Sequence, residues 1–287
     1  MPRSHPLLQV LLVSVSLAAC GEVSGGVSGA GPTASQQIEL RLAVEDEVAS
    51  ALAALTVAEP GLPPSFAGPA GCPAISDTTD SDDDNVPDDA TLTFLDPPCS
   101  VTGLGGGDWS VTGTLRIRDT SATTTRYVLD YTDLAWSFTD SAATRTYTAT
   151  RNGTRIRLGT TSGASLQVDV TIDRDRPNRA TATVDLATTV SYVSDTTGTV
   201  AVGQPLPDGL LSIAGSMGWQ RSTENWSLAV ATTQPLVYDA DCDTTPQRIK
   251  GGRVTLTGTV NGQAGVLTLT WTACGVPPSR SWAAGAV

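Results

Sequence analysis

Apolar and polar residues alternate along most of the chain after residue 91, and this pattern predicts a protein built mainly from strands. The alternation is clearest in residues 166–173 and 180–192, where apolar side chains occupy every second position. Roughly ten such segments follow one another without intervening helices, as in antiparallel proteins. The pattern fits an antiparallel β-sandwich and a single curved or barrel-like sheet equally well.

Turn and bulge signals divide these strands. The Asn-Gly pairs at 152–153 and 261–262 predict tight hairpin turns, because both residue types accept the positive φ angles that such turns require. In residues 124–138 the apolar side chains change from odd to even positions. This change of face predicts a bulge or a bend within that strand.

One helix is expected, over about residues 36–58, ahead of the strands. Its apolar residues recur three and four positions apart and form a stripe that suits packing on a sheet: Leu40, Val44, Val48, Leu52 and Leu55. Ser35 is the expected N-cap, and Pro60 with Gly61 ends the helix. No linker divides the chain after this point, so we expect a single mainly-β domain over residues 36–287.

The first twenty residues have the layout of an export signal, with Arg3 followed by an apolar run that ends at "LAAC", residues 17–20. This ending resembles the lipobox of bacterial lipoproteins. The resemblance implies a signal peptide over residues 1–19 and a mature chain that begins with lipid-bearing Cys20. Residues 20–35 are rich in Gly and Ser and are expected to form a flexible tether. Gly21 follows the cysteine where an aspartate favours inner-membrane retention, so the resemblance implies the outer membrane of the bacterial envelope.

Charge and cysteine content agree with an exported protein. The net charge of -12 excludes a nucleic-acid partner, which needs a basic surface. Apart from Cys20, the chain has an even number of cysteines, which suits disulfides in an oxidising compartment: Cys72, Cys99, Cys242 and Cys274. Four cysteines allow three pairings, and we favour Cys72–Cys99 and Cys242–Cys274 because each closes a local loop.

The residues after Cys20 include no histidine, which removes Ser-His-Asp and Cys-His catalysis and histidine-bound metals. We therefore expect a protein that is not an enzyme. Trp136 and Trp271 are expected in the core. Trp109, Trp219 and Trp226 adjoin polar residues, and core packing is the favoured reading over an exposed patch for sugar or partner contact.

Residues 77–90, "DTTDSDDDNVPDDA", form an acidic loop in which seven of fourteen residues are aspartate. Its spacing offers oxygen ligands for a structural Ca²⁺ ion: Asp80, Asp82, Asp84, the main-chain carbonyl of Val86, and Asp88. Residues 80–91 resemble a single calcium loop of the thrombospondin type 3 and EF-hand-like kind. They depart from it at Asn85, which replaces a glycine, and at Thr91, where a closing acidic ligand is expected. The alternative is a solvated acidic loop without an ion.

These features lead to one main hypothesis about function and two alternatives. The main hypothesis is a lipid-anchored, non-enzymatic envelope protein with a binding or structural role. The first alternative is a periplasmic carrier of a hydrophobic ligand, in which a curved sheet and a helix enclose a cavity. The second is a glycan-acting hydrolase that uses paired carboxylates and exposed tryptophans. The sequence does not identify a glycan, lipid or protein partner.

Overall fold

The computed structural model describes part of the chain, in these ranges: 31–56, 72–77, 79–84, 86–104, 107–121, 126–140, 145–160, 162–177, 179–196, 200–202, 204–242 and 248–285. The expected signal peptide, Cys20, most of the tether, Asn85 and the helix stop at Pro60 lie outside these residues.

The described residues form one antiparallel sheet of twelve strands and one helix, α1. The strands are β1 (Ala74–Ile75), β2 (Asp89–Leu104), β3 (Gly107–Asp119), β4 (Arg126–Asp140), β5 (Thr146–Thr160), β6 (Gly163–Asp175), β7 (Ala182–Ser194), β8 (Gly209–Arg221), β9 (Glu224–Tyr238), β10 (Ile249–Val260), β11 (Gln263–Trp271) and β12 (Ser279–Ala284). Each strand pairs with the next one along the chain, so the order in the sheet is the order in the sequence.

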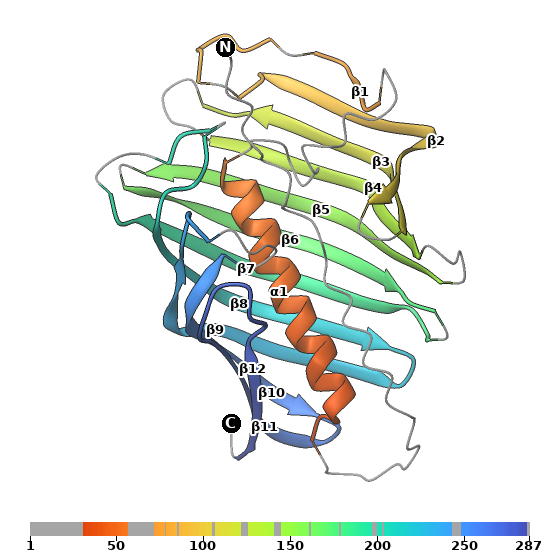
Figure 1. Ribbon diagram of the computed structural model, residues 1–287, viewed down its shortest axis with the longest axis vertical. Coiled ribbons are helices and arrows are strands. Elements are labelled where there is room, and N and C mark those ends of the chain that lie inside the picture. Colours follow the sequence, from red (N-terminus) through yellow and green to blue (C-terminus); the bar gives the residue numbers. More distant parts are fainter. Residues whose placement is uncertain are drawn as a thin grey trace.

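The sheet curves around α1, which crosses the concave face diagonally (Figure 1). This arrangement confirms the expected mainly-β class with one helix near the N-terminus. Of the two architectures left open, the structure has the single curved sheet and not the sandwich. The concave face carries the alternating apolar residues of the central strands, and the convex face carries their polar neighbours.

Helix α1 (Ala34–Thr56) begins earlier than expected, and its N-cap is Thr33. The Thr33 hydroxyl accepts a hydrogen bond from the Gln36 main-chain N–H at 3.3 Å, and Gln36 Oε1 accepts one from the Thr33 N–H at 2.8 Å. This reciprocal pair is a capping box. The prediction of Ser35 as the cap was therefore wrong, because Ser35 already lies within the helix.

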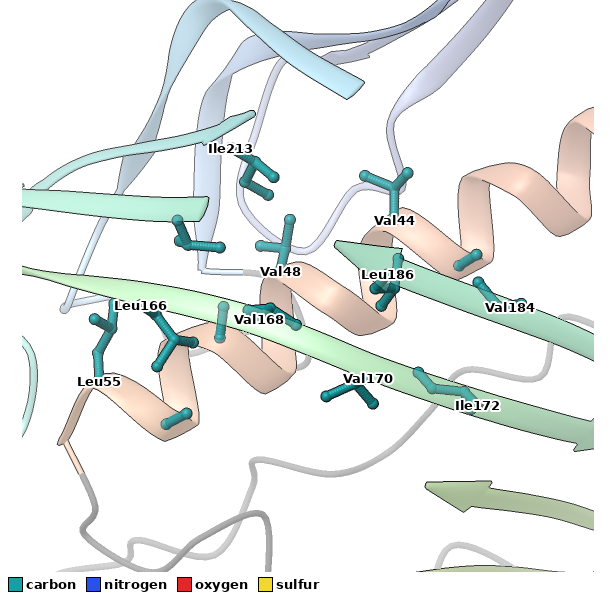
Figure 2. Close-up of a cluster of buried hydrophobic side chains, with 14 of the residues drawn as sticks. Val44, Val48, Leu55, Leu166, Val168, Val170, Ile172, Val184, Leu186 and Ile213 are labelled. Carbon is teal, nitrogen blue, oxygen red and sulfur yellow. The ribbon is translucent and has the colours of Figure 1, made fainter. Parts of the chain in front are cut away.

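Helix α1 packs its apolar stripe onto β6, β7 and β8 (Figure 2). On the helix, Val44, Val48 and Leu55 are at most 4% exposed. They face a floor of similar residues on the strands, including Leu166, Val168, Val170, Ile172, Val184, Leu186 and Ile213. Burial of each such side chain stabilises the fold by about 1.5–3 kcal/mol, so this stripe is the main apolar attachment of α1.

The Asn152-Gly153 pair lies inside β5 and does not form a hairpin turn, so that prediction was wrong. Gly153 has a φ of +119°, and the register between β4 and β5 shifts between Tyr131 and Leu134, opposite this point. The Asn152 side chain accepts a hydrogen bond from the Asp133 N–H at 2.7 Å and donates one to its carboxylate at 3.1 Å. The pair thus forms part of a bulge that bends two strands together.

The other two local predictions are confirmed. Asn261 and Gly262 have φ angles of +50° and +78° and connect β10 to β11 in a tight turn. The expected irregularity in residues 124–138 is the same register shift in β4. Such shifts increase local twist, which helps a long sheet to curve.

Two disulfides close loops at the two edges of the sheet, and both have the favoured pairing. Cys72–Cys99 joins the segment before β1 to β2, and Cys242–Cys274 joins the segment after β9 to the segment after β11. Neither involves α1, so non-covalent contacts hold the helix in the concave face.

Candidate functional site

The acidic loop brings three of the expected ligands together. Carboxylate oxygens of Asp80, Asp82 and Asp84 lie within 4.8 Å of one another, a spacing that one cation can span. The turn that gathers them is made at Asp83, which has a φ of +59°. Val86 closes the turn, because its N–H donates to Asp84 Oδ1 at 2.8 Å and its side chain is fully buried.

Asp88 does not join this cluster. Its carboxylate accepts hydrogen bonds from the Ser81 N–H at 3.0 Å and the Ser81 hydroxyl at 2.5 Å. Both bonds lower the pKa of Asp88. The Asp88 N–H also donates to the Thr79 carbonyl at 2.7 Å. Asp88 therefore closes the base of the loop, a role different from the ligand role expected of it.

Asp119, which the sequence analysis did not include, adds a fourth carboxylate to the neighbourhood. It ends β3, and its N–H contacts the carbonyls of Pro87 and Asp88 at 3.3 and 3.2 Å. Its charge contributes to raising the pKa values of both Asp82 and Asp84. The pairing of Asp89 with Arg118 in the β2–β3 ladder is what brings Asp119 to this position.

Crowding of like charge is visible in the loop itself. The pKa of Asp82 is raised, first by desolvation and then by Asp119. The pKa of Asp84 is also raised by desolvation, although the Val86 N–H opposes the shift. A bound cation would reverse this penalty, since it favours the charged form of each carboxylate. The donor set is all oxygen, as Ca²⁺ requires, but only three of the expected side chains are gathered.

A second concentration of charge lies under α1, where acids of the helix meet arginines of the sheet. Glu47 pairs with Arg155 of β5 at 2.6 Å, and both side chains are buried, at 3% and 0% exposure. Arg155 also donates to the Ser50 hydroxyl. Asp46 pairs with Arg174 of β6 at 2.6 Å. The middle of α1 is therefore held by two ion pairs to adjacent strands.

The two ends of α1 are fixed by polar contacts as well. Near the N-terminal end, the buried Glu39 carboxylate contacts the guanidinium groups of both Arg179 and Arg221. At the C-terminal end, Arg157 donates to the Leu55 carbonyl at 2.8 Å, and the Tyr127 hydroxyl donates to the Ala54 carbonyl. These donors satisfy carbonyls that a helix end leaves without intrahelical partners.

Arg151 also lies on this face, and no carboxylate of the described residues forms an ion pair of 4 Å or less with it. Its guanidinium lies 5.4 Å from the Tyr131 ring centre and 5.0 Å from that of Trp136. Desolvation, followed by repulsion from Arg155, lowers the pKa of Arg151 to about 10. The rings of Tyr131 and Trp136 therefore stabilise the Arg151 cation, and the charges of Glu47 and Asp46 add an attraction from outside ion-pair distance.

Sequence reasoning missed these arginines because it assigns charged residues to the solvent side of a strand. In "TRIRL" of β5, Arg155 and Arg157 are fully buried, while Ile156 between them is partly exposed. The one available signal was the matching set of acids in the expected helix, including Glu39 and Glu47.

The tryptophans do not form an exposed patch. Trp109, Trp219 and Trp226 are 9%, 1% and 6% exposed, which confirms the favoured reading that they pack in the core. Trp219 stacks on Trp226 with ring centres 6.1 Å apart and donates to Glu224 at 3.1 Å. Trp271 is buried as expected, and Trp136 is partly buried.

The space between α1 and the sheet is filled. Beside Val48, Leu52 and Trp271 there is a cavity of about 10 Å³, which is close to the smallest volume that holds one water. A larger groove of about 580 Å³ is open to solvent at the tips of the β8–β9 and β10–β11 hairpins. Neutral residues line it, namely Thr223, Asn225, Trp226, Ser227, Gly258, Thr259, Asn261 and Gly262.

Within the described residues, no helix is both long enough and apolar enough to cross a membrane. Comparison of the chain with protein-family models, with curated proteins and with solved structures finds no match.

Proposed function

We propose that this chain is a lipid-anchored protein of the bacterial cell envelope, attached to the outer membrane through Cys20, with a binding role and without enzymatic activity. The lipobox resemblance of residues 17–20 and the Gly/Ser-rich segment that follows support the anchor. The lack of histidine after Cys20 removes Ser-His-Asp and Cys-His catalysis, which supports a role that is not enzymatic.

The observation that carries the proposal is the fixed position of the chain where it enters the fold. The Asn261 side chain donates to the Gly31 carbonyl at 3.0 Å and to Gln36 Oε1 at 2.9 Å. Gln36 in turn donates to Glu224 at 2.7 Å. The expected tether therefore joins the domain beside the β8–β9 and β10–β11 hairpins, and the opposite end of the sheet is farther from the anchor along the chain.

A structural calcium ion belongs to the same proposal. Asp80, Asp82 and Asp84 supply side-chain oxygens, and Asp119 adds a nearby negative charge that raises the pKa values of Asp82 and Asp84. The ion would hold the loop together beside the end of β3. Its contribution is stability of that loop and not chemistry.

The carrier remains a second candidate because a curved apolar face with arginines is present, although α1 occupies it. The hydrolase is not proposed further, since the tryptophans that suggested it are buried.

Metabolic labelling with a palmitate analogue tests the anchor directly. The wild-type chain is expected to carry the label and to fractionate with the outer membrane, whereas Cys20→Ser remains unlabelled and is recovered without detergent. Gly21→Asp is the matched control, which keeps the label and moves the protein to the inner membrane. A wild-type protein without label, or equal labelling of Cys20→Ser, contradicts the proposal.

A further inference from the structure

We propose that α1 occupies a binding site for an anionic amphiphile, and that a ligand with an acidic head group and an acyl chain displaces the helix from the concave face. This inference rests on the binding role proposed above and names the class of ligand. The chemistry is shared by free fatty acids and by anionic lipids, which differ in the source of the acidic group.

The floor of the site suits an acyl chain. Leu166, Val168, Val170 and Ile172 follow one another along β6, and Val184 and Leu186 continue the apolar surface on β7 (Figure 2). All six are at most 4% exposed while α1 is in place. A helix of 23 residues covers a length of about 35 Å, which exceeds the length of an extended sixteen-carbon chain (about 20 Å).

Arginine side chains on the concave face can bind the acidic head group. Arg155, Arg157 and Arg174 project onto the concave face and are 0%, 0% and 7% exposed. Guanidinium groups bind carboxylates and phosphates through two parallel hydrogen bonds, which makes a row of them selective for such heads. Arg151 continues the row on β5 and has no carboxylate partner among the described residues.

Helix α1 brings to this site the same chemical groups as the proposed ligand, namely carboxylates and apolar carbon atoms. Glu47 places a carboxylate on Arg155, and Asp46 places one on Arg174, each at 2.6 Å. Val44, Val48 and Leu55 fill the apolar floor beside them (Figure 2). A buried glutamate in a helix that packs on a sheet is uncommon, since glutamate is almost never fully buried unless it is paired. The helix therefore resembles an occupant of an anion site more than a simple apolar cover.

The contacts that hold α1 on the sheet are non-covalent, so a ligand can compete for them. Buried ion pairs contribute little net stability compared with apolar packing, because both charges regain hydration when they separate. Neither disulfide restrains the helix, since both join strand-flanking segments at the sheet edges. An acidic head group can take the place of Glu47 or Asp46, and an acyl chain can take the place of the apolar stripe. The contacts of Glu39 with Arg179 and Arg221 are not replaced by such a ligand.

Calorimetric titration of the full chain with three lauroyl compounds tests the site, together with hydrogen exchange of residues 34–56. Laurate represents a free fatty acid, lauroyl-lysophosphatidylglycerol an anionic lipid, and monolaurin a neutral head on the same chain. We expect at least one of the two acidic compounds to bind one per chain, at least tenfold more tightly than monolaurin, and to speed exchange in α1 while β6 and β7 stay protected. The stronger acidic compound identifies the source of the head group.

Two variants sharpen the result. Asp46→Asn with Glu47→Gln weakens the hold of α1 and is expected to tighten binding of the acidic compound at least tenfold, whereas Asp239→Asn, in an exposed pair with Lys250, leaves it unchanged. Absence of binding to the wild type and the double variant, binding of monolaurin as tight as that of the acids, or binding without faster exchange in α1 overturns the proposal. Labelling of Cys20 is independent of all three results, so failure here is distinguishable from failure of the anchor.

Discussion

The Arg155 guanidinium of β5 and the Glu47 carboxylate of α1 form an ion pair at 2.6 Å in which both side chains are almost fully buried. Desolvation opposes the charged form of Arg155, but the attractions and hydrogen bonds of Glu47 and Tyr131 together raise its pKa. The two residues are 108 positions apart in the chain, so the pair specifies where α1 lies across the sheet. Position and not net stability is the best-attested contribution of such pairs.

Arg151 and Arg155 are expected to respond differently to the same substitution. Arg151→Met removes a cation that has ring contacts but no ion pair in the described residues, so its cost is less than about 1 kcal/mol. Arg155→Met leaves the Glu47 carboxylate buried without its partner and costs about 3–5 kcal/mol. Urea denaturation of both variants measures the difference, and equal losses contradict the assignment.

The same Arg151 variant yields a test in alkaline solution. The folded protein releases the Arg151 proton near a pKa of about 10, below the value of the unfolded chain. Above that pH the unfolded state binds more protons than the folded state, so the free energy of unfolding contributed by this group rises with pH. The stability of wild type relative to Arg151→Met should therefore increase above about pH 10. A difference in stability between the two proteins that does not change with pH contradicts the lowered pKa of Arg151.

The stability of helix α1 is expected to depend on the Thr33 side chain and not on that of Ser35. Thr33→Ala removes the hydroxyl that accepts from the Gln36 N–H, and loss of a cap costs about 1 kcal/mol. Ser35→Ala is the matched control, since its hydroxyl accepts only a long contact of 3.3 Å from Arg179. Thermal unfolding of the two variants shows which residue caps the helix. A larger loss of stability for Ser35→Ala than for Thr33→Ala shows that the helix begins later than described.

Gly153 should not tolerate a side chain. Its φ is +119°, and a Cβ there meets the Asp169 carbonyl oxygen at 2.3 Å, so Gly153→Ala is expected to cost about 2 kcal/mol or more. Gly251→Ala is the control within the same sheet, because its nearest neighbour is a Val237 methyl group at 3.7 Å. Equal midpoints for the two variants in chemical denaturation contradict the bulge.

The Asn152-Gly153 pair also shows what the sequence alone could not predict. The dipeptide has the chemistry of a hairpin turn, yet the same freedom of φ suits a bulge, and only the pairing with Asp133 of β4 decides between them. The alternating strands and the helix were predictable because each follows a local period. The inward arginines of β5 were not, since their partners lie on a helix about a hundred residues earlier.

In the acidic loop too, local spacing predicts some of the contacts, and the tertiary fold decides the others. Asp80, Asp82 and Asp84 follow from spacing within a few residues, and the structure brings them together. Asp119 reaches the loop only through the β2–β3 register, and Asp88 is drawn to Ser81 by hydrogen bonds that spacing does not reveal.

Calcium is expected to stabilise the protein through this loop. With a dissociation constant of about 1 mM, which is typical of extracellular sites, 10 mM calcium adds about 1.4 kcal/mol to the free energy of unfolding. The combined change of Asp80, Asp82 and Asp84 to Asn removes this effect, and Asp119→Asn reduces it. Asp239→Asn leaves it unchanged, since that carboxylate pairs with Lys250 elsewhere. Identical melting midpoints of the wild type in calcium and in chelator contradict the site.

A double-mutant cycle between Glu47 and Arg155 tests most directly whether buried ion pairs position α1. Glu47→Met and Arg155→Met are each expected to cost about 3–5 kcal/mol in denaturant unfolding, because each leaves an uncompensated buried charge. The double variant is expected to lie within about 1 kcal/mol of wild type, since two apolar side chains of similar size then replace the pair. Losses that simply add in the double variant would mean that Glu47 and Arg155 do not act on each other, and that α1 is not held across the sheet as described.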